Sequence, residues 1–239
     1  MLKLRSLRDN NRLILKLNKD NIDYYIKNTK KIIKYSDNHK LELEVYYNKK
    51  KLTDKDLDNE NINIRDMFTI MQAINIKDKY KRYEYIYDIV CSYLDNLIST
   101  NYCEFINDVC IRDRLNGTNH KNGCCECKGR GKCKYLVNSI CIEKSCMACK
   151  LFTCKVLREK GIVHSLNDYV LTKYFFTNKQ KDILRFSYWT PKKVILDRLV
   201  NNKYVRPWYV KFMSNFKVLK MRFLRLFFKI YKNFLNRIS

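Results

Sequence analysis

The sequence predicts an α+β fold with four consecutive parts: a small N-terminal α/β element, a helical connector, a metal-stapled cysteine-rich module and a helical, basic C-terminal region. Three observations predict this class. Apolar and polar residues alternate in two short runs near the N-terminus, an apolar stripe with helical spacing precedes residue 100, and ten of the eleven cysteines lie in a short central window. The predicted boundaries of the four parts are residues 1–62, 63–101, 102–160 and 161–239.

Two β-strands are predicted in the N-terminal element. Leu13, Leu15 and Leu17 alternate with other residues, which is the period of a strand that buries one face. Residues 41–47 alternate in the same way and predict a half-exposed strand. The polar stretch 48–61 predicts a loop.

Helices are predicted on either side of the second strand. Asp20 or Asn21 is suited to cap one helix, because short polar side chains accept hydrogen bonds from the first turn. Its apolar positions keep roughly helical spacing: Ile22, Tyr25, Ile26, Ile32 and Ile33. From about Arg65 a second helical pattern begins, and its apolar face is the following: Ile86, Ile89, Val90, Tyr93, Leu94, Leu97 and Ile98. Cys91 falls within this helix, and we expect it to be a buried core thiol.

The net charge is +25, from 49 Lys and Arg against 24 Asp and Glu. Such a charge favours an anionic partner such as nucleic acid or an acidic membrane surface. Lys, Asn and Ile are all abundant here and can be encoded by A/T-only codons, so genome composition alone can raise the lysine content. The charge therefore indicates a partner only where it is localised.

The start of the chain lacks the continuous apolar stretch of a signal peptide, because charged residues interrupt it every few positions. No apolar run reaches the 18 or more residues of a spanning helix. The expected location is the cytoplasm, with peripheral association at a membrane as a further option. In a reducing compartment, clustered cysteines indicate metal binding rather than disulfides.

The cysteine cluster is the strongest functional signal in the sequence. Zinc takes four ligands in a tetrahedron, and a Cys-x2-Cys turn such as Cys146–Cys149 presents two thiolates to one ion. Four of the five glycines also lie in this region, where tight ligand-bearing turns need them. The candidate metal ligands are Cys103, Cys110, Cys124, Cys125, Cys127, Cys133, Cys141, Cys146, Cys149 and Cys154.

An iron–sulfur cluster is the alternative to zinc. Cys141-x4-Cys146-x2-Cys149 reproduces the spacing of a plant-type [2Fe–2S] loop. The fourth ligand of that pattern normally follows well downstream, whereas Cys154 is the last cysteine of this chain. One sequence does not assign individual cysteines to individual ions.

Three short signatures carry a resemblance to known proteins: Asn122-Gly-Cys-Cys125, Cys146-Met-Ala-Cys-Lys-Leu-Phe-Thr-Cys154 and Phe175-Phe-Thr-Asn-Lys-Gln-Lys-Asp-Ile183. Over residues 103–200 the chain resembles uncharacterised cysteine-rich proteins of low-G+C anaerobic bacteria. The resemblance implies a bacterial origin and a shared metal-binding module. It implies no particular activity.

Two helix starts are predicted after the cluster. Thr177 and Gln180 have the spacing of a capping box. Thr190 followed by Pro191 is typical of an N-cap with proline at the first helical position.

The last part of the chain is strongly basic. Residues 198–239 contain eleven basic residues and no acidic one. A helix over 207–235 would carry one aromatic-rich stripe: Phe212, Phe216, Leu219, Phe223, Leu226, Ile230 and Phe234. Such a helix suits docking on the protein's own core, an anionic membrane interface, or the phosphates of nucleic acid.

No phosphate loop, H-E-x-x-H motif, nucleophile elbow or paired-carboxylate motif occurs in the sequence. We therefore expect binding rather than catalysis. The predicted function is that of a metal-binding protein, with zinc first, that serves as an interaction module for an anionic partner. The alternative is an iron–sulfur protein in electron transfer or in a redox enzyme.

Overall fold

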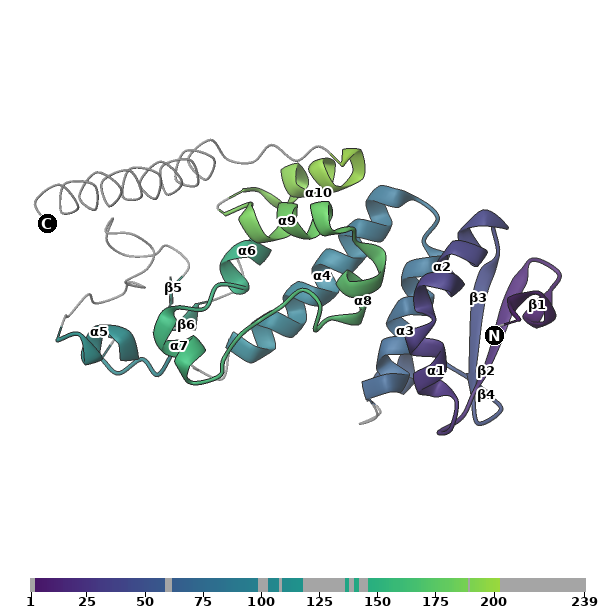
Figure 1. Cartoon of the computed structure of the whole chain (residues 1–239), viewed down its shortest axis with the longest axis horizontal. Helices are drawn as coiled ribbons and strands as arrows, with labels where there is room; N and C mark the ends of the chain where they lie inside the picture. Colours follow the sequence, from purple (N-terminus) through teal and green to yellow (C-terminus); the bar gives the residue numbers. More distant parts are fainter. Residues whose placement is uncertain are drawn as a thin grey trace, which may run out of the picture. The chain divides into compact units, whose positions relative to one another are not determined.

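The computed structural model describes residues 3–58, 62–98, 103–107, 109–117, 136–137, 140–141, 146–188 and 190–202 (Figure 1). Within these residues the chain is α+β, as predicted. The strands are β1 (Arg8–Asp9), β2 (Arg12–Leu17), β3 (Glu42–Tyr47), β4 (Lys50–Lys51), β5 (Leu136–Val137) and β6 (Ile140–Cys141). The helices are α1 (Ile22–Lys27), α2 (Thr29–Asn38), α3 (Ile62–Asn75), α4 (Lys79–Ile98), α5 (Ile111–Leu115), α6 (Met147–Lys150), α7 (Lys155–Glu159), α8 (Val170–Phe175), α9 (Asn178–Phe186) and α10 (Lys192–Asn201), with 3-10 turns at Leu4–Leu7 and Asp54–Asp58.

The N-terminal strands form a four-stranded sheet in the order β1-β2-β3-β4. β2 and β3 are parallel, with Leu13 opposite Leu43 and Leu15 opposite Val45, while β1 and β4 pair antiparallel at the two edges. Both predicted strands are confirmed. A parallel pair needs a crossover connection, and α1 and α2 supply it.

Helices α1, α2 and α3 cover one face of this sheet (Figure 1). Alternation along β2 and β3 directs every second side chain into that layer, where apolar burial stabilises the fold. The largest fully buried side chains there include Leu13, Leu15, Ile32, Leu43, Met67, Ile70 and Ile74.

The single helix predicted after β2 is wrong, because the chain forms two helices that meet at Asn28. The Asn28 side chain donates to the Tyr24 carbonyl at 2.8 Å and so competes with the helical backbone pattern. The predicted cap is also absent: Asn21 makes no capping bond, and its side-chain oxygen accepts from the Asn18 N–H at 2.9 Å instead.

On the face of the sheet that the helices leave uncovered, one residue differs from the half-exposed strand predicted over 41–47. Glu44 alternates to this face yet is only 9% exposed. Its carboxylate accepts from Lys51 Nζ at 2.8 Å and from Arg12 Nη1 at 3.5 Å. These bonds, the one from Lys51 foremost, lower the pKa of Glu44 and keep it ionised.

The loop predicted over residues 48–61 is wrong in part. It begins as a tight hairpin into β4, with Asn48 and Lys49 both at positive φ. A 3-10 turn follows at Asp54–Asp58, where Asp56 accepts from the Thr53 N–H.

The long helix α4 contacts α3, α6, α8 and α10 (Figure 1). Two side chains of α4 have buried partners later in the chain: Tyr83 packs edge-to-face on Phe176 at 5.0 Å between ring centroids, and Tyr87 lies against α6. The predicted helical face is confirmed in part: Ile86, Val90 and Leu94 are fully buried, whereas Leu97 is 43% exposed.

The capping box at α9 is confirmed. Thr177 Oγ1 accepts from the Gln180 N–H, and Gln180 Oε1 accepts from the Thr177 N–H at 2.9 Å. At α10 the prediction is one residue off, because Pro191 takes the N-cap position and the helix begins at Lys192. The basic tail helix predicted over 207–235 lies outside the described residues. Among the helices that the structure describes, none combines the length and apolarity needed to cross a membrane.

Candidate metal centre

The structure describes the side chains of five of the ten predicted ligands: Cys103, Cys110, Cys146, Cys149 and Cys154. All five are thiols rather than disulfides. Cys141 closes strand β6. The other four, Cys124, Cys125, Cys127 and Cys133, lie outside the described residues.

Cys146 and Cys149 converge at the start of α6. Their sulfur atoms are 3.4 Å apart. Cys146 is the N-cap residue with extended backbone, and its carbonyl accepts from the Cys149 N–H at 2.9 Å. This turn brings both thiols to one side, as the Cys-x2-Cys spacing predicts.

Three short helices of the region begin directly after a cysteine. Cys110, Cys146 and Cys154 are the N-cap residues of α5, α6 and α7, each with φ near −70° and an extended ψ. The same local conformation therefore recurs at three predicted ligands. It positions a sulfur beside a helical first turn, whose N–H groups have no partner within the helix.

Cys103 and Cys110 lie at the two ends of a compact turn. The Ile111 N–H donates to the Cys103 carbonyl at 3.1 Å, and Ile106 and Val109 form an isolated bridge between them. The Cys110 thiol donates to the Asp113 carboxylate at 3.8 Å, and both side chains are buried.

Helix α6 is anchored to α4 by polar contacts. The Met147 N–H donates to the hydroxyl of Tyr87 at 3.0 Å. Lys150 Nζ forms an ion pair with Asp95, and the Lys150 side chain is only 3% exposed. Met147 itself is fully buried. The cysteine pair is therefore held against the rest of the described fold rather than carried on an isolated loop.

Cys91 lies in this same neighbourhood, which the sequence did not indicate. Burial raises its pKa to about 12, while Lys150 and a hydrogen bond with Tyr87 act in the opposite direction. Tyr87 also has a raised pKa, from burial first and then from Cys91 and Cys146. Cys91 is accordingly a neutral thiol, but its side chain is half-buried rather than fully buried as predicted.

The signal that points to this neighbourhood is a spacing of four residues. Tyr87, Cys91 and Asp95 follow one another at i, i+4 and i+8 along α4, so they share one helical face. Tyr87 accepts a hydrogen bond from Met147 of α6, and Asp95 pairs with Lys150 of α6. Cys91 lies close enough to Tyr87 and Lys150 for both to affect its pKa.

Within the described residues, no group of three or more His, Cys, Asp or Glu side chains is close enough to hold a metal ion. The described geometry thus supplies a converging pair at Cys146 and Cys149. A tetrahedral site needs two more ligands.

Comparison with known proteins gives no further assignment. No family model matches the chain, and no curated protein or solved structure matches it at a significant level. The resemblance to cysteine-rich bacterial proteins stays a prediction.

Proposed function

We propose that the chain is a zinc-binding protein whose cysteine-rich module folds around the metal. The observation that carries the proposal is the 3.4 Å separation of the Cys146 and Cys149 sulfur atoms. Two thiolates on one tetrahedral zinc, each about 2.3 Å from the ion, are roughly 3.8 Å apart. A small side-chain rotation of either cysteine brings the pair to that separation.

The chemistry of the region supports the same conclusion. Zinc prefers thiolate ligands, and binding requires that each thiol lose its proton. Lys and Arg are interspersed among the cysteines, and nearby cations favour the thiolate. Cys146 and Cys149 provide two ligands, and the remaining eight predicted ligands supply the others.

Metal analysis of the full-length protein, purified under reducing and anaerobic conditions, tests the proposal. We expect one or two zinc ions per chain, because ten cysteines can fill two four-ligand sites. The double variant Cys146→Ser/Cys149→Ser should lose about one ion. Cys91→Ser is the matched control, since it removes a neighbouring thiol and should retain the wild-type zinc content.

Two results would overturn the proposal. The first is a wild-type protein that contains no metal and is fully folded. The second is iron with visible absorption in place of zinc, which would assign the Cys141, Cys146 and Cys149 spacing to an iron–sulfur cluster.

We further propose that the basic residues 198–239 attach the module to an anionic surface. The eleven basic residues and complete lack of acidic ones support this. Flotation of the full-length chain with anionic and neutral liposomes, against a truncation after Val200, measures the attachment. Equal flotation of the two proteins would exclude residues 201–239 as the segment that attaches the chain to a membrane.

A further inference from the structure

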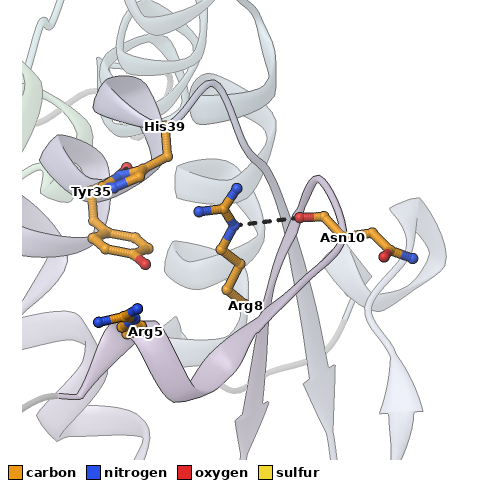
Figure 2. Close-up of a pocket in the computed structure, with 5 residues that line it drawn as sticks. All are labelled: Arg5, Arg8, Asn10, Tyr35 and His39. Carbon is orange, nitrogen blue, oxygen red and sulfur yellow. Dashed lines mark hydrogen bonds between the residues drawn. The ribbon is translucent and has the colours of Figure 1, made fainter.

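A cavity of about 540 Å³ lies between the N-terminal segment and the end of α2. Five residues line it: Arg5, Arg8, Asn10, Tyr35 and His39 (Figure 2). None of them belongs to the cysteine-rich module. Arg5, Arg8, Asn10 and His39 are exposed and Tyr35 is half-buried, so the cavity is a depression that opens to solvent.

The edge strand β1 directs Arg8 into this cavity. Arg8 is paired with Leu13 across β1 and β2, and cross-strand partners project from the same face of a sheet. Leu13 is fully buried on the helix-covered face, so Arg8 extends toward that layer at the open edge of the sheet. Its Nε donates to the Asn10 carbonyl at 3.5 Å, and Asn10 has a positive φ of 47° in the turn that follows.

The opposite wall is aromatic. Tyr35 lies on the last turn of α2 and His39 is the C-cap residue of that helix, with ring centroids separated by 4.2 Å and planes inclined by 33°. His39 Nδ1 donates to the Tyr35 carbonyl at 2.8 Å. This bond fixes the orientation of the imidazole and leaves Nε2 as the nitrogen that can meet a ligand. Figure 2 shows Arg8 extending toward this aromatic pair.

The cavity is cationic and lacks a counter-charge. The two carboxylates nearest in sequence are engaged elsewhere: Asp9 pairs with Arg12 at 3.6 Å, and Asp37 binds Arg82 through two bonds of 3.0 Å. Among the residues that the structure describes, no carboxylate forms an ion pair with Arg5 or Arg8, and none lines the cavity. Two guanidinium groups thus face one space that contains no anion of the protein.

We propose that this cavity binds a mononucleotide, with the phosphate on Arg5 and Arg8 and the base against Tyr35 and His39. A guanidinium presents a planar fork of donors that matches phosphate oxygens. Aromatic rings provide a stacking surface for a base. A phosphate ion would contact the guanidinium groups alone, and the planar group of the ester accounts for the aromatic wall.

Asn10 meets Arg8 through its backbone carbonyl, whereas its side chain points away from the other four residues (Figure 2). The His39 imidazole adds a polar group to the aromatic wall. The proposal does not depend on zinc. The cysteine double variant should bind the nucleotide as the wild type does, so failure of one proposal leaves the other intact.

Calorimetric titration of the full-length chain with adenosine 5′-monophosphate tests the proposal, with adenosine and inorganic phosphate as separate probes. We expect the monophosphate to bind at least about tenfold more tightly than either fragment, because it uses both walls. Arg5→Gln and Arg8→Gln should each weaken its binding about tenfold or more, as loss of a charge-assisted hydrogen bond does. Arg185→Gln is the matched control, since Arg185 is exposed on α9 and the variant loses the same charge.

Further variants distinguish the contribution of the arginine side of the cavity from that of the aromatic side. Arg5→Lys keeps the charge without the fork and should also weaken binding. Tyr35→Leu should weaken the monophosphate while leaving inorganic phosphate unchanged. Denaturant midpoints of all variants confirm that they fold.

Three results would overturn the proposal. One is equal affinity of the wild type, Arg5→Gln and Arg8→Gln for the monophosphate. Another is equal affinity for the monophosphate and for inorganic phosphate. The third is binding of a single-stranded oligonucleotide, sensitive to Arg5→Gln, by a protein that does not bind the mononucleotide, which would assign the site to a polymer.

Discussion

The backbone N–H of Met147 donates a 3.0 Å hydrogen bond to the hydroxyl of Tyr87, sixty residues earlier in the chain. Both groups are buried, so water does not compete for the bond. It joins the first turn of α6, which carries Cys146 and Cys149, to the middle of α4. Together with the ion pair between Lys150 and Asp95, this bond holds the cysteine-bearing helix on the helical part of the fold.

Replacement of Tyr87 by phenylalanine should lower the free energy of unfolding by about 1–3 kcal/mol, because it leaves a buried N–H without an acceptor. Urea denaturation measures the change. Tyr24→Phe is the control, since it removes the same hydroxyl from a residue that is 43% exposed on α1. The zinc content of Tyr87→Phe should stay at the wild-type value, because the turn that joins Cys146 and Cys149 is local. Unchanged stability would show that the bond contributes nothing.

The local features of this fold follow from the sequence. Alternation of Leu13, Leu15 and Leu17 defines β2, because a strand has a period of two whatever it packs against. The capping box of Thr177 and Gln180 is likewise encoded within four residues. The convergence of Cys146 and Cys149 belongs to the same class, since a three-residue spacing at a helix start determines it.

The features that the sequence did not predict are non-local. Glu44 is buried because Arg12 and Lys51, from the strands on either side, close over it. Cys91 lies beside the candidate metal centre because α6 docks on α4. The four-residue spacing of Tyr87, Cys91 and Asp95 places them on one helical face but does not encode that α6 covers it. A sequence pattern reports the period of an element but not which distant element covers its face.

The ion pair between Lys150 and Asp95 should be asymmetric in its effect on stability. The Lys150 side chain is 3% exposed, whereas that of Asp95 is 28% exposed. Asp95→Asn leaves a buried ammonium without its carboxylate and should lower the free energy of unfolding by about 2–3 kcal/mol. This is less than the cost of breaking a completely buried ion pair, because Asp95 is partly exposed. Lys150→Met leaves a carboxylate that water still reaches and should cost less than about 1 kcal/mol. Urea denaturation of both variants gives the comparison, and an equal or reversed order would contradict the asymmetry.

Asp66 should make the protein less stable as the pH rises from about 4 to about 6. Burial raises the pKa of its carboxyl from 3.8 to about 6, against a smaller opposing effect of Arg65. In this interval the folded state holds a proton that the unfolded state has lost, so the stabilisation is complete below pH 3.8 and is lost as the pH passes 6. The change amounts to at most about 3 kcal/mol.

Asp66→Asn removes this titration and tests its origin. The variant should be more stable than the wild type near neutral pH, because it buries an amide instead of a carboxylate, and the difference should shrink as the pH falls toward 4. Urea midpoints of both proteins across this range measure the effect. A constant difference between the two curves would mean that Asp66 titrates at its ordinary pKa in the folded protein. A difference that grows toward acid would reverse the sign of the coupling between its protonation and folding.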